Sequence, residues 1–196
     1  MFECLNVKML KCQGFTLIEV LVSIFIIILL AGIIFANYRQ SGKQLALQRS
    51  ASKLALDIRR TQEMAMSARE FGQAIPVGGY GIHLDESYNQ RYILFADCDG
   101  EGDYDESGTA ISCADATPGP ANSYPESIEG EIGFEKGVQI CFSCFGATGT
   151  VDIVFIPPDP KVTFTPDVTE QTIWLTNDGQ TKKIYVNKAG LIDIRE

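Results

Sequence analysis

The feature that most constrains this chain is an uninterrupted apolar run near its amino terminus. Residues 15–36 read FTLIEVLVSIFIIILLAGIIFA, and these 22 residues contain one ionisable side chain, Glu19, and no proline. As an α-helix rising 1.5 Å per residue, the run would extend about 33 Å, which is enough to cross the hydrocarbon core of a bilayer. It is therefore predicted to be a membrane-spanning helix.

A cleaved secretory signal peptide is the main alternative for this run. Signal peptides have apolar regions of ~7 to 15 residues that end at a small-residue cleavage site. Here the run is longer, and it continues through Asn37 and Tyr38 into a helix-forming stretch, which favours a retained anchor. Because Lys8 and Lys11 precede the run, we expect the amino terminus to stay in the cytoplasm and the rest of the chain to be exported.

Glu19 is the unusual residue of the apolar run. A carboxylate inside a membrane span costs roughly 2.5 to 3.5 kcal/mol on insertion scales, so such a residue is expected to have a partner or a task. The alternative is that Glu19 lies near the end of the span among lipid head groups and has no special role.

Residues 11–20, KCQGFTLIEV, resemble the cleavage and N-methylation motif of type IV prepilins and type II secretion pseudopilins. The resemblance implies that a prepilin peptidase cuts between Gly14 and Phe15 and methylates Phe15. It also implies that Glu19, the fifth residue after the cut, acts in assembly. A physical account agrees, because the cut gives Phe15 a positive amine that a carboxylate of an adjacent subunit would neutralise in an apolar setting.

The chain then divides into a cleaved leader (1–14), a transmembrane helix (15–38), an amphipathic helix (39–70) and a β-rich distal domain (71–196). The amphipathic helix is predicted from apolar residues that recur at spacings near 3, 4 and 7 on one face. These residues are Leu47, Ala51, Leu54, Ile58, Ala65 and Ala68. Ser41-Gly42 is a candidate hinge, since glycine in a helix costs ~1 kcal/mol relative to alanine.

The distal domain alternates short β segments with turn residues. Strands are predicted at 80–84, 91–96, 138–142, 151–156, 172–176, 182–187 and 191–194. The sequences 177–179 (NDG) and 188–190 (KAG) predict antiparallel hairpins, and prolines interrupt residues 157–160. A sheet needs an apolar cover, which the amphipathic helix provides, so the predicted class is α+β with a pilin-like long helix on an antiparallel sheet. Segments 80–84, 91–97 and 184–192 loosely resemble those of H-type pseudopilins and related minor pilins.

Charge is divided along the chain, which has a formal net charge of -9. Residues 39–70 hold seven cations against three carboxylates, whereas the residues after Glu70 hold seven cations against twenty. The acidic distal domain disfavours binding to nucleic acid. The basic helix face is expected to be solvated, or to meet acidic surfaces of neighbouring subunits or anionic membrane lipid.

Residues 97–106, DCDGEGDYDE, form the densest polar cluster. Carboxylates at alternate positions with glycines between them suit Ca²⁺, which takes six to eight oxygen ligands. The candidate ligands are Asp97, Asp99, Glu101, Asp103 and Asp105. The loop starts like an EF-hand, but Gly108 stands where the closing glutamate belongs, so a looser calcium loop and a solvated acidic turn remain the two interpretations.

Four of the six cysteines remain after loss of the leader, namely Cys98, Cys113, Cys141 and Cys144. An even number in an exported domain indicates disulfides, with three possible connectivities. We prefer Cys98 with Cys113, closing the acidic loop, and Cys141 with Cys144, closing a turn. A zinc site lacks ligands and a thioredoxin-like site lacks its βαβ setting.

The chain offers little for catalysis. His83 is its only histidine, and no serine or carboxylate pattern near it supports a triad, so we interpret it as a sheet residue or a satisfied core group. A membrane-tethered hydrolase has no support beyond the carboxylates. No phosphate-binding glycine loop is present in the sequence, so ATP chemistry is expected to belong to a partner.

The leading hypothesis is a non-enzymatic structural subunit, a minor pilin or pseudopilin. Its expected partners are prepilin peptidase, other pilin subunits, membrane lipid, and an inner-membrane assembly platform with its ATPase. One alternative is a DNA-capturing minor pilin, for which Lys182, Lys183, Lys188 and Arg195 are the late cations. Another is a membrane-anchored, secreted calcium-binding protein, which would be cut after the apolar run.

Overall fold

The computed structural model of the chain describes residues 15–72, 74–104, 113, 127–157 and 161–195, and the side chains of 34–39 are not among them. The backbone forms two compact units, Met1–Ser41 and Gly42–Glu196. The boundary falls at Ser41-Gly42, where glycine predicted a hinge. The secondary structure nevertheless contains one helix, α1 (Leu17–Met66), with residues in both units.

The helix α1 ends at Met66, before the Glu70 boundary drawn from the sequence. Its end is a tight turn in which the Arg69 amide donates to the Met64 carbonyl (3.1 Å) and the Ala68 amide donates to the Ala65 carbonyl (3.0 Å). Ala68 has a φ of 45° in this turn. A left-handed residue just beyond the last helical turn is the usual way to pair the final carbonyls, so the helix cannot continue through it.

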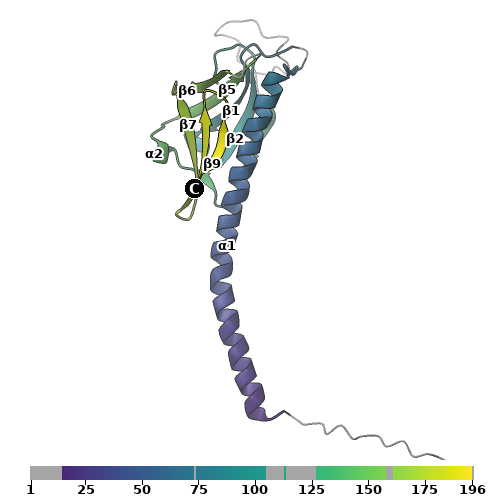
Figure 1. Cartoon of the computed structure of the whole chain (residues 1–196), viewed down its shortest axis with the longest axis vertical. Helices are drawn as coiled ribbons and strands as arrows, with labels where there is room; N and C mark the ends of the chain where they lie inside the picture. The colour runs from purple at the N-terminus through teal and green to yellow at the C-terminus, as the bar shows by residue number, and fades with distance from the viewer. Residues whose placement is uncertain (1–14, 73, 105–112, 114–126, 158–160, 196) are drawn as a thin grey trace, which may run out of the picture. The chain divides into compact units, whose positions relative to one another are not determined.

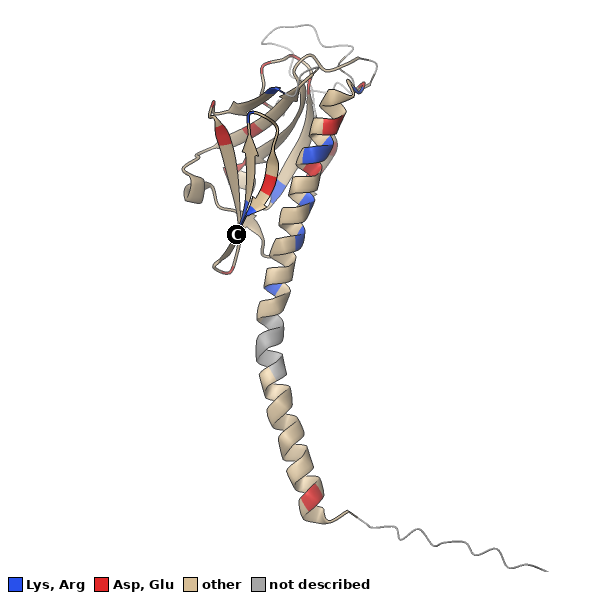
Figure 2. Ribbon diagram, viewed as in Figure 1, with Lys and Arg blue, Asp and Glu red and all other residues tan. Residues whose placement is uncertain are grey.

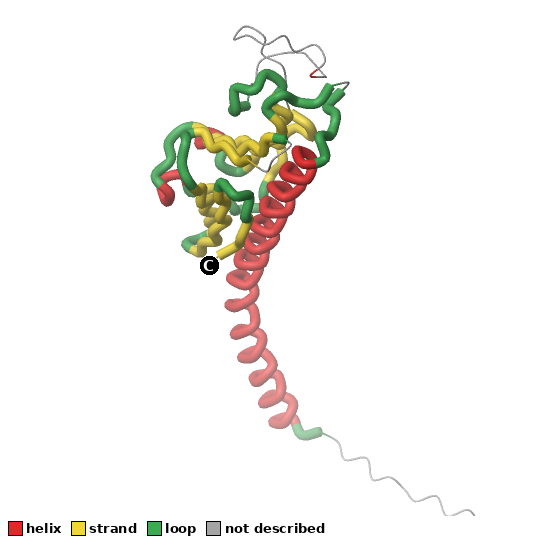
Figure 3. The backbone as a smooth tube through the Cα atoms, turned by 45° about the horizontal axis from the view of Figure 1, so that its top comes forward, coloured by secondary structure: helices red, strands yellow, loops and turns green. Residues whose placement is uncertain are grey.

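The second unit contains two antiparallel sheets beside α1 (Figures 1 and 3). The larger has the order β3-β2-β1-β5-β6 and the smaller the order β4-β7-β8-β9. The strands are β1 (Gly79–Asp85), β2 (Arg91–Asp97), β3 (Ser127–Gly133), β4 (Gln139–Ile140), β5 (Thr150–Ile156), β6 (Lys161–Thr165), β7 (Glu170–Asn177), β8 (Gln180–Asn187) and β9 (Ile192–Arg195). Two short helices complete the unit, η1 (Glu86–Tyr88) and α2 (Phe142–Phe145).

One hydrophobic core joins the later part of α1 to both sheets. The buried face of the helix consists of Leu47, Ala51, Leu54, Ala55, Ile58, Met64 and Ala65. The strands contribute alternate side chains such as Ile82, Leu94 and Ile184 to the same cluster. The sequence stripe therefore predicted the packed face of the helix, except for Ala68 in the exposed terminal turn. The predicted α+β class, a long helix with an antiparallel sheet domain, is confirmed.

The hairpins at the carboxyl end are also confirmed. β7 ends at Asn177 and β8 begins at Gln180, so two residues, Asp178 and Gly179, form the turn. Both have positive φ angles, 50° and 81°. A two-residue hairpin with positive φ at both positions is the type I′ turn that an Asp-Gly pair favours. β8 and β9 pair in the same antiparallel sense.

Three elements differ from the sequence prediction. The strand predicted at 138–142 is wrong in its second half, because only Gln139–Ile140 is strand and Phe142 begins α2. Strands β3 and β6 were not predicted. β3 is a half-exposed edge strand with two glycines, which weakens the apolar alternation. β6 is short and lies between prolines, which we interpreted as a break, although it alternates inward Val162 and Phe164.

Candidate functional site

The start of α1 carries the residues of the predicted processing and assembly site. The Glu19 amide donates to the Thr16 carbonyl (3.1 Å) and approaches the Thr16 hydroxyl oxygen at 3.4 Å. Thr16 thus caps the helix, and Glu19 stands three residues later in the Thr-x-x-Glu pattern of a capping box. The sequence analysis missed this capping role, although the Thr16-Leu17-Ile18-Glu19 spacing contains it.

The position of Glu19 in the first turn has an electrostatic consequence. The amino-terminal end of a helix carries a partial positive charge that favours a carboxylate there. Glu19 is the acidic residue of the first turn of α1, and Ser23 donates its hydroxyl hydrogen to the Glu19 carbonyl (2.7 Å). Gly14, on the other side of the predicted cut, lies outside the described residues. Phe15 is described, and its side chain is 78% exposed.

All large apolar side chains of residues 15–33, the described side chains at the start of α1, are exposed. They are Phe15, Leu17, Ile18, Val20, Leu21, Val22, Ile24, Phe25, Ile26, Ile27, Ile28, Leu29, Leu30 and Ile33. A continuous apolar surface of this length marks a site of association with membrane or protein. In the described residues, no helix has a continuous stretch that is both long enough and apolar enough to span a membrane.

Comparison with known proteins bears on this same segment. Residues 9–35 match the family profile described as the prokaryotic N-terminal methylation motif. The chain carries a prepilin-type methylation motif. The match includes the predicted cut, the predicted methylated residue and Glu19. Neither the comparison with curated proteins nor that with solved structures gave a match. The methylation motif therefore supports a type IV pilin-like protein, on the part of the chain that begins α1.

Away from the methylation motif, the loop after β2 contains the predicted calcium ligands. Asp97 is buried, with 1% of its surface exposed. Its carboxylate accepts hydrogen bonds from the Gly100 amide (2.6 Å) and the Gly102 amide (3.0 Å). Burial is the main cause that raises the pKa of Asp97 to about 7, and the neighbouring Asp99 carboxyl also raises it. Asp97 therefore holds the loop backbone together.

The other predicted ligands are distributed along the same loop. Asp99 accepts from the Glu101 amide (3.1 Å), whereas Glu101 and Asp103 are exposed. Asp105 lies outside the described residues. Over the described part of the chain, no group of three or more His, Cys, Asp or Glu side chains is placed to hold a metal ion. Calcium binding stays a prediction.

Two disulfides lie in the second unit, and they have the pairings preferred from the sequence. Cys98 is bonded to Cys113 with a Cα–Cα distance of 5.1 Å, and Cys141 to Cys144 with 5.3 Å. The Cys113 amide donates to the carbonyl of Phe71 (3.3 Å), just after α1. The first disulfide thus connects the acidic loop to the segment that follows the helix. The second spans the start of α2.

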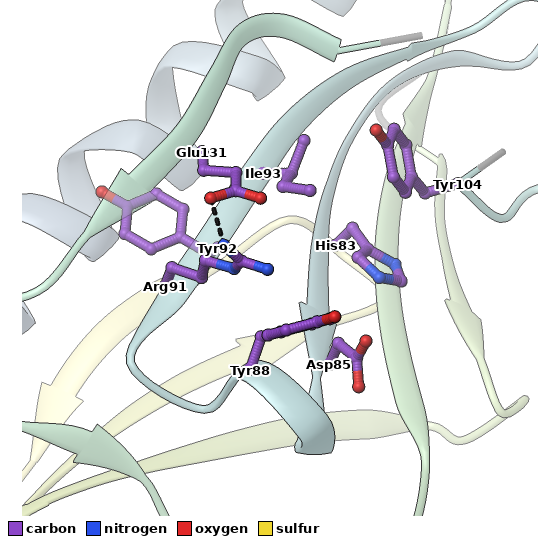
Figure 4. Close-up of a pocket in the computed structure, with 8 residues that line it drawn as sticks. All are labelled: His83, Asp85, Tyr88, Arg91, Tyr92, Ile93, Tyr104 and Glu131. Carbon is purple, nitrogen blue, oxygen red and sulfur yellow. Dashed lines mark hydrogen bonds and ion pairs between the residues drawn. The ribbon is translucent and has the colours of Figure 1, made fainter. Parts of the chain in front are cut away.

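His83 lies in a small pocket on the face of the larger sheet opposite α1 (Figure 4). Its Nδ1 atom is 2.6 Å from Oδ1 of Asp152, and both side chains are buried. Burial raises the pKa of Asp152, and the contact with His83 opposes that shift. The ring of Tyr104 packs on His83 at a centroid distance of 4.9 Å. His83 is therefore a satisfied core group, one of the two interpretations made from the sequence.

The sequence analysis missed Asp152 as the partner of His83. The signal is an acidic residue inside the otherwise apolar strand VDIVFI, since a buried carboxylate needs a partner. The described residues that line this pocket contain no serine, threonine or cysteine to act as a nucleophile. Arg91 forms an ion pair with Glu131 at its edge, and Figure 4 shows this pair beside Tyr88.

Three of the late cations considered for DNA binding have partners within the chain. Lys183 lies over the Trp174 ring at 4.5 Å from its centroid, and Arg195 lies over the Tyr185 ring at 4.2 Å. Lys188 forms an ion pair with Asp167 at 2.7 Å. Arg195 also forms an ion pair with Asp193 at 3.0 Å. The two ion pairs offset the charge of Lys188 and Arg195 toward a phosphate backbone, whereas Lys183 keeps its charge over the ring.

Proposed function

We propose that this chain is a structural subunit, a minor pilin or pseudopilin, of a type IV pilus-like or type II secretion filament. The single observation that carries the proposal is the methylation motif at residues 9–35 at the start of a helix with exposed apolar side chains. Lipid covers the apolar side chains of such a helix before assembly, and neighbouring helices cover them afterwards. The work of the protein is mechanical, and we propose no catalytic role.

Processing by prepilin peptidase begins the proposed sequence of events. The peptidase cuts between Gly14 and Phe15 and methylates Phe15, which becomes the amino terminus. The new amine is positively charged, and in apolar surroundings it needs a carboxylate partner. Glu19 of a neighbouring subunit supplies that carboxylate. Because the pair forms only when two helices have one particular offset, it selects the register of assembly.

The proposed location follows from the same segment. The first part of α1 anchors the chain in the cytoplasmic membrane, with the leader inside and the second unit exported. The two disulfides agree with export, because disulfides persist in oxidising compartments outside the cytoplasm. Assembly then requires an inner-membrane platform with its ATPase, and the product is a filament at the cell envelope or surface.

The proposal is tested by following the amino terminus. The full-length chain is produced in membranes with and without a prepilin peptidase, and the product is analysed by intact mass and amino-terminal sequencing. We expect loss of residues 1–14 and one added methyl group on Phe15 only when the peptidase is present. Gly14→Leu serves as the matched control and should stay uncut. A product that begins at Met1, or after residue 36, would contradict the proposal.

Calcium binding by residues 97–105 is a second proposal that rests on carboxylate density. Isothermal calorimetry on the full chain should show heat with calcium and little with magnesium, because the loop is rich in oxygen ligands and calcium tolerates irregular geometry. Absence of both heat and a thermal shift at millimolar calcium would reject it.

A further inference from the structure

The later part of α1 carries five cations, and two of them have no partner among the residues that the structure describes. Lys43, Arg59 and Arg60 are engaged with Asp178, the Ile192 carbonyl and Glu129. Arg49 and Lys53 are exposed and contact no carboxylate or carbonyl among the described residues. Figure 2 shows the cations as bands along this part of α1. Unpaired cations are unexpected in a unit with so large an excess of carboxylates.

These two cations line a groove with a volume of about 390 Å³. The opposite wall is the segment between β3 and β4, which contributes Phe134 and a third cation, Lys136. Lys136 is exposed and likewise has no ionic partner in the described residues. The groove thus holds three cations against one carboxylate, that of Glu135. It is suited to an acidic ligand.

The walls of the groove are held in place by contacts below it. The Glu135 amide donates to the hydroxyl oxygen of Ser50 at 3.1 Å, and Ser50 is buried. The Phe134 ring packs on Tyr92 with a centroid distance of 5.2 Å. Tyr92 in turn donates its hydroxyl hydrogen to Asp57 of α1. The backbone that carries the cations is therefore already held by hydrogen bonds and packing. Binding of a ligand would need to order little more than the cationic side chains.

The acidic loop lies near the carboxyl-terminal end of α1. Cys98 is bonded to Cys113, whose amide donates to the Phe71 carbonyl beyond the end of the helix. The Gly78 amide donates to the Asp97 carbonyl at 3.0 Å, which holds the start of the loop in the same region. Glu101 and Asp103 are exposed there, and none of the ion pairs in the described chain includes either.

The two charged regions cannot neutralise each other within one molecule. From Lys53 to Met66 the helix rises about 20 Å, at 1.5 Å per residue. The Debye length at physiological ionic strength is only about 8 Å. Each region therefore keeps its charge available for a second molecule.

We propose that the groove formed by Arg49, Lys53 and Lys136 receives the acidic loop around Glu101 and Asp103 of a second copy of this chain. This inference rests on the proposed function and names the partner of the second unit. The contact joins two different surfaces, so each copy keeps one free groove and one free loop. Contacts of this heterologous kind propagate into open filaments. The charges contribute mainly to the register of the contact and to the rate of association, and added salt weakens the attraction between them.

The first test maps the contact directly. The peptidase-cut chain, residues 15–196, is prepared with normal and with heavy nitrogen, and the two are mixed in phosphatidylcholine vesicles. A carbodiimide then joins amines to carboxylates that lie in contact. We expect peptides containing Lys53 or Lys136 joined to the loop peptide of the other isotope. Multimers without any such mixed peptide would overturn the inference.

The second test exchanges the charges. Arg49→Glu with Lys53→Glu makes the groove acidic, and Glu101→Lys with Asp103→Lys places two cations at the exposed positions of the loop. We expect either double variant alone to form multimers at least fivefold less well than the unaltered chain. A mixture of the two should recover, because the acidic groove of one variant then meets the two lysines in the loop of the other. A mixture that stays as poor as its components would overturn the inference.

The matched control for the groove variant is Lys161→Glu with Lys188→Glu, which lowers the net charge by the same amount at other surfaces. It should form multimers like the unaltered chain. Leader removal is read in the same samples. If the unaltered chain is not cut or forms no multimers, the proposed function fails and the inference with it. If it is cut and forms multimers, but groove reversal behaves like the control, only the inference is overturned.

Discussion

The two parts of α1 differ in the exposure of their apolar side chains. Leu21, in the first unit, is 57% exposed, whereas Leu54, in the second, is fully buried. The first part has apolar side chains on every side, and the second has a single apolar stripe. A stripe can be covered by one sheet of the same chain, but an apolar cylinder cannot. The comparison teaches that the second unit completes its core internally, while the first needs lipid or other helices.

The two units also differ in how many charged side chains they carry. The described side chains of the first unit before residue 34 include one ionisable group, Glu19. The second unit carries many charges, and most cations on its part of α1 are paired within the chain. The lone carboxylate of the apolar part has no such partner among the described residues, which makes it the group most suited to select a neighbour.

The largest expected effect comes from removing that carboxylate. Glu19→Gln should leave leader removal intact but lower the yield of multimers at least tenfold, because the amine of Phe15 loses its charged partner. The matched control is Glu63→Gln, an exposed glutamate of the same helix. Membrane fractions are analysed by native electrophoresis and amino-terminal sequencing. Equal multimer yields for the two variants would remove Glu19 from the assembly mechanism.

The contrast in burial predicts a contrast in stability. Leu54→Ala should lower the free energy of unfolding of the second unit by about 2 to 5 kcal/mol, the usual cost of truncating a buried leucine. Leu56→Ala, on the exposed side of the same turn at 61% exposure, should change it by less than about 0.5 kcal/mol. Urea unfolding of the full chain in detergent, followed by fluorescence of the single Trp174, measures both. Equal losses of unfolding free energy in the two variants would show that Leu54 is not more buried than Leu56.

The two disulfides should differ in the stability they contribute. The Cys98–Cys113 pair closes a sequence separation of 15, and the Cys141–Cys144 pair one of 3. On the chain-entropy account, replacing the first pair with serines should cost about 3 kcal/mol and replacing the second about 2 kcal/mol. The same urea experiment, with intact masses to verify the oxidation state, distinguishes them. A second pair that matters more than the first would indicate that α2 contributes to the fold beyond its disulfide.

The smallest expected effect is a pH dependence within the second unit. Because the pKa of Asp97 is raised from 3.8 to about 7, the folded state binds its proton more tightly than the unfolded state. Stability should therefore fall as the pH rises from 5 to 7, by about 1 to 2 kcal/mol from this group. Asp97→Asn should flatten the dependence, whereas Glu63→Gln should retain it. A slope that persists unchanged in Asp97→Asn would assign it to other groups.

The sequence predicted the local elements well where a single periodicity was strong. The apolar face of the later helix and the Asp178-Gly179 turn both appear in the structure. Prediction failed where the local signal was weak or mixed. β3 is a half-exposed edge with glycines, and Phe142 begins a one-turn helix after a two-residue strand. The motif around Phe15 and Glu19 was accessible from sequence because its residues are adjacent in the chain.

The sequence by itself determined the apolar run, the methylation motif, the helix stripe and the charge division, since each depends on residues within a few turns of one another. Only the tertiary structure decided that His83 meets Asp152, that Asp97 turns inward to hold its loop, and that Arg49, Lys53 and Lys136 share a groove. The His83–Asp152 contact and the groove join residues far apart in sequence, and the burial of Asp97 depends on the packing of the sheet around its loop. Such pairings follow from strand order and packing, which no local pattern specifies.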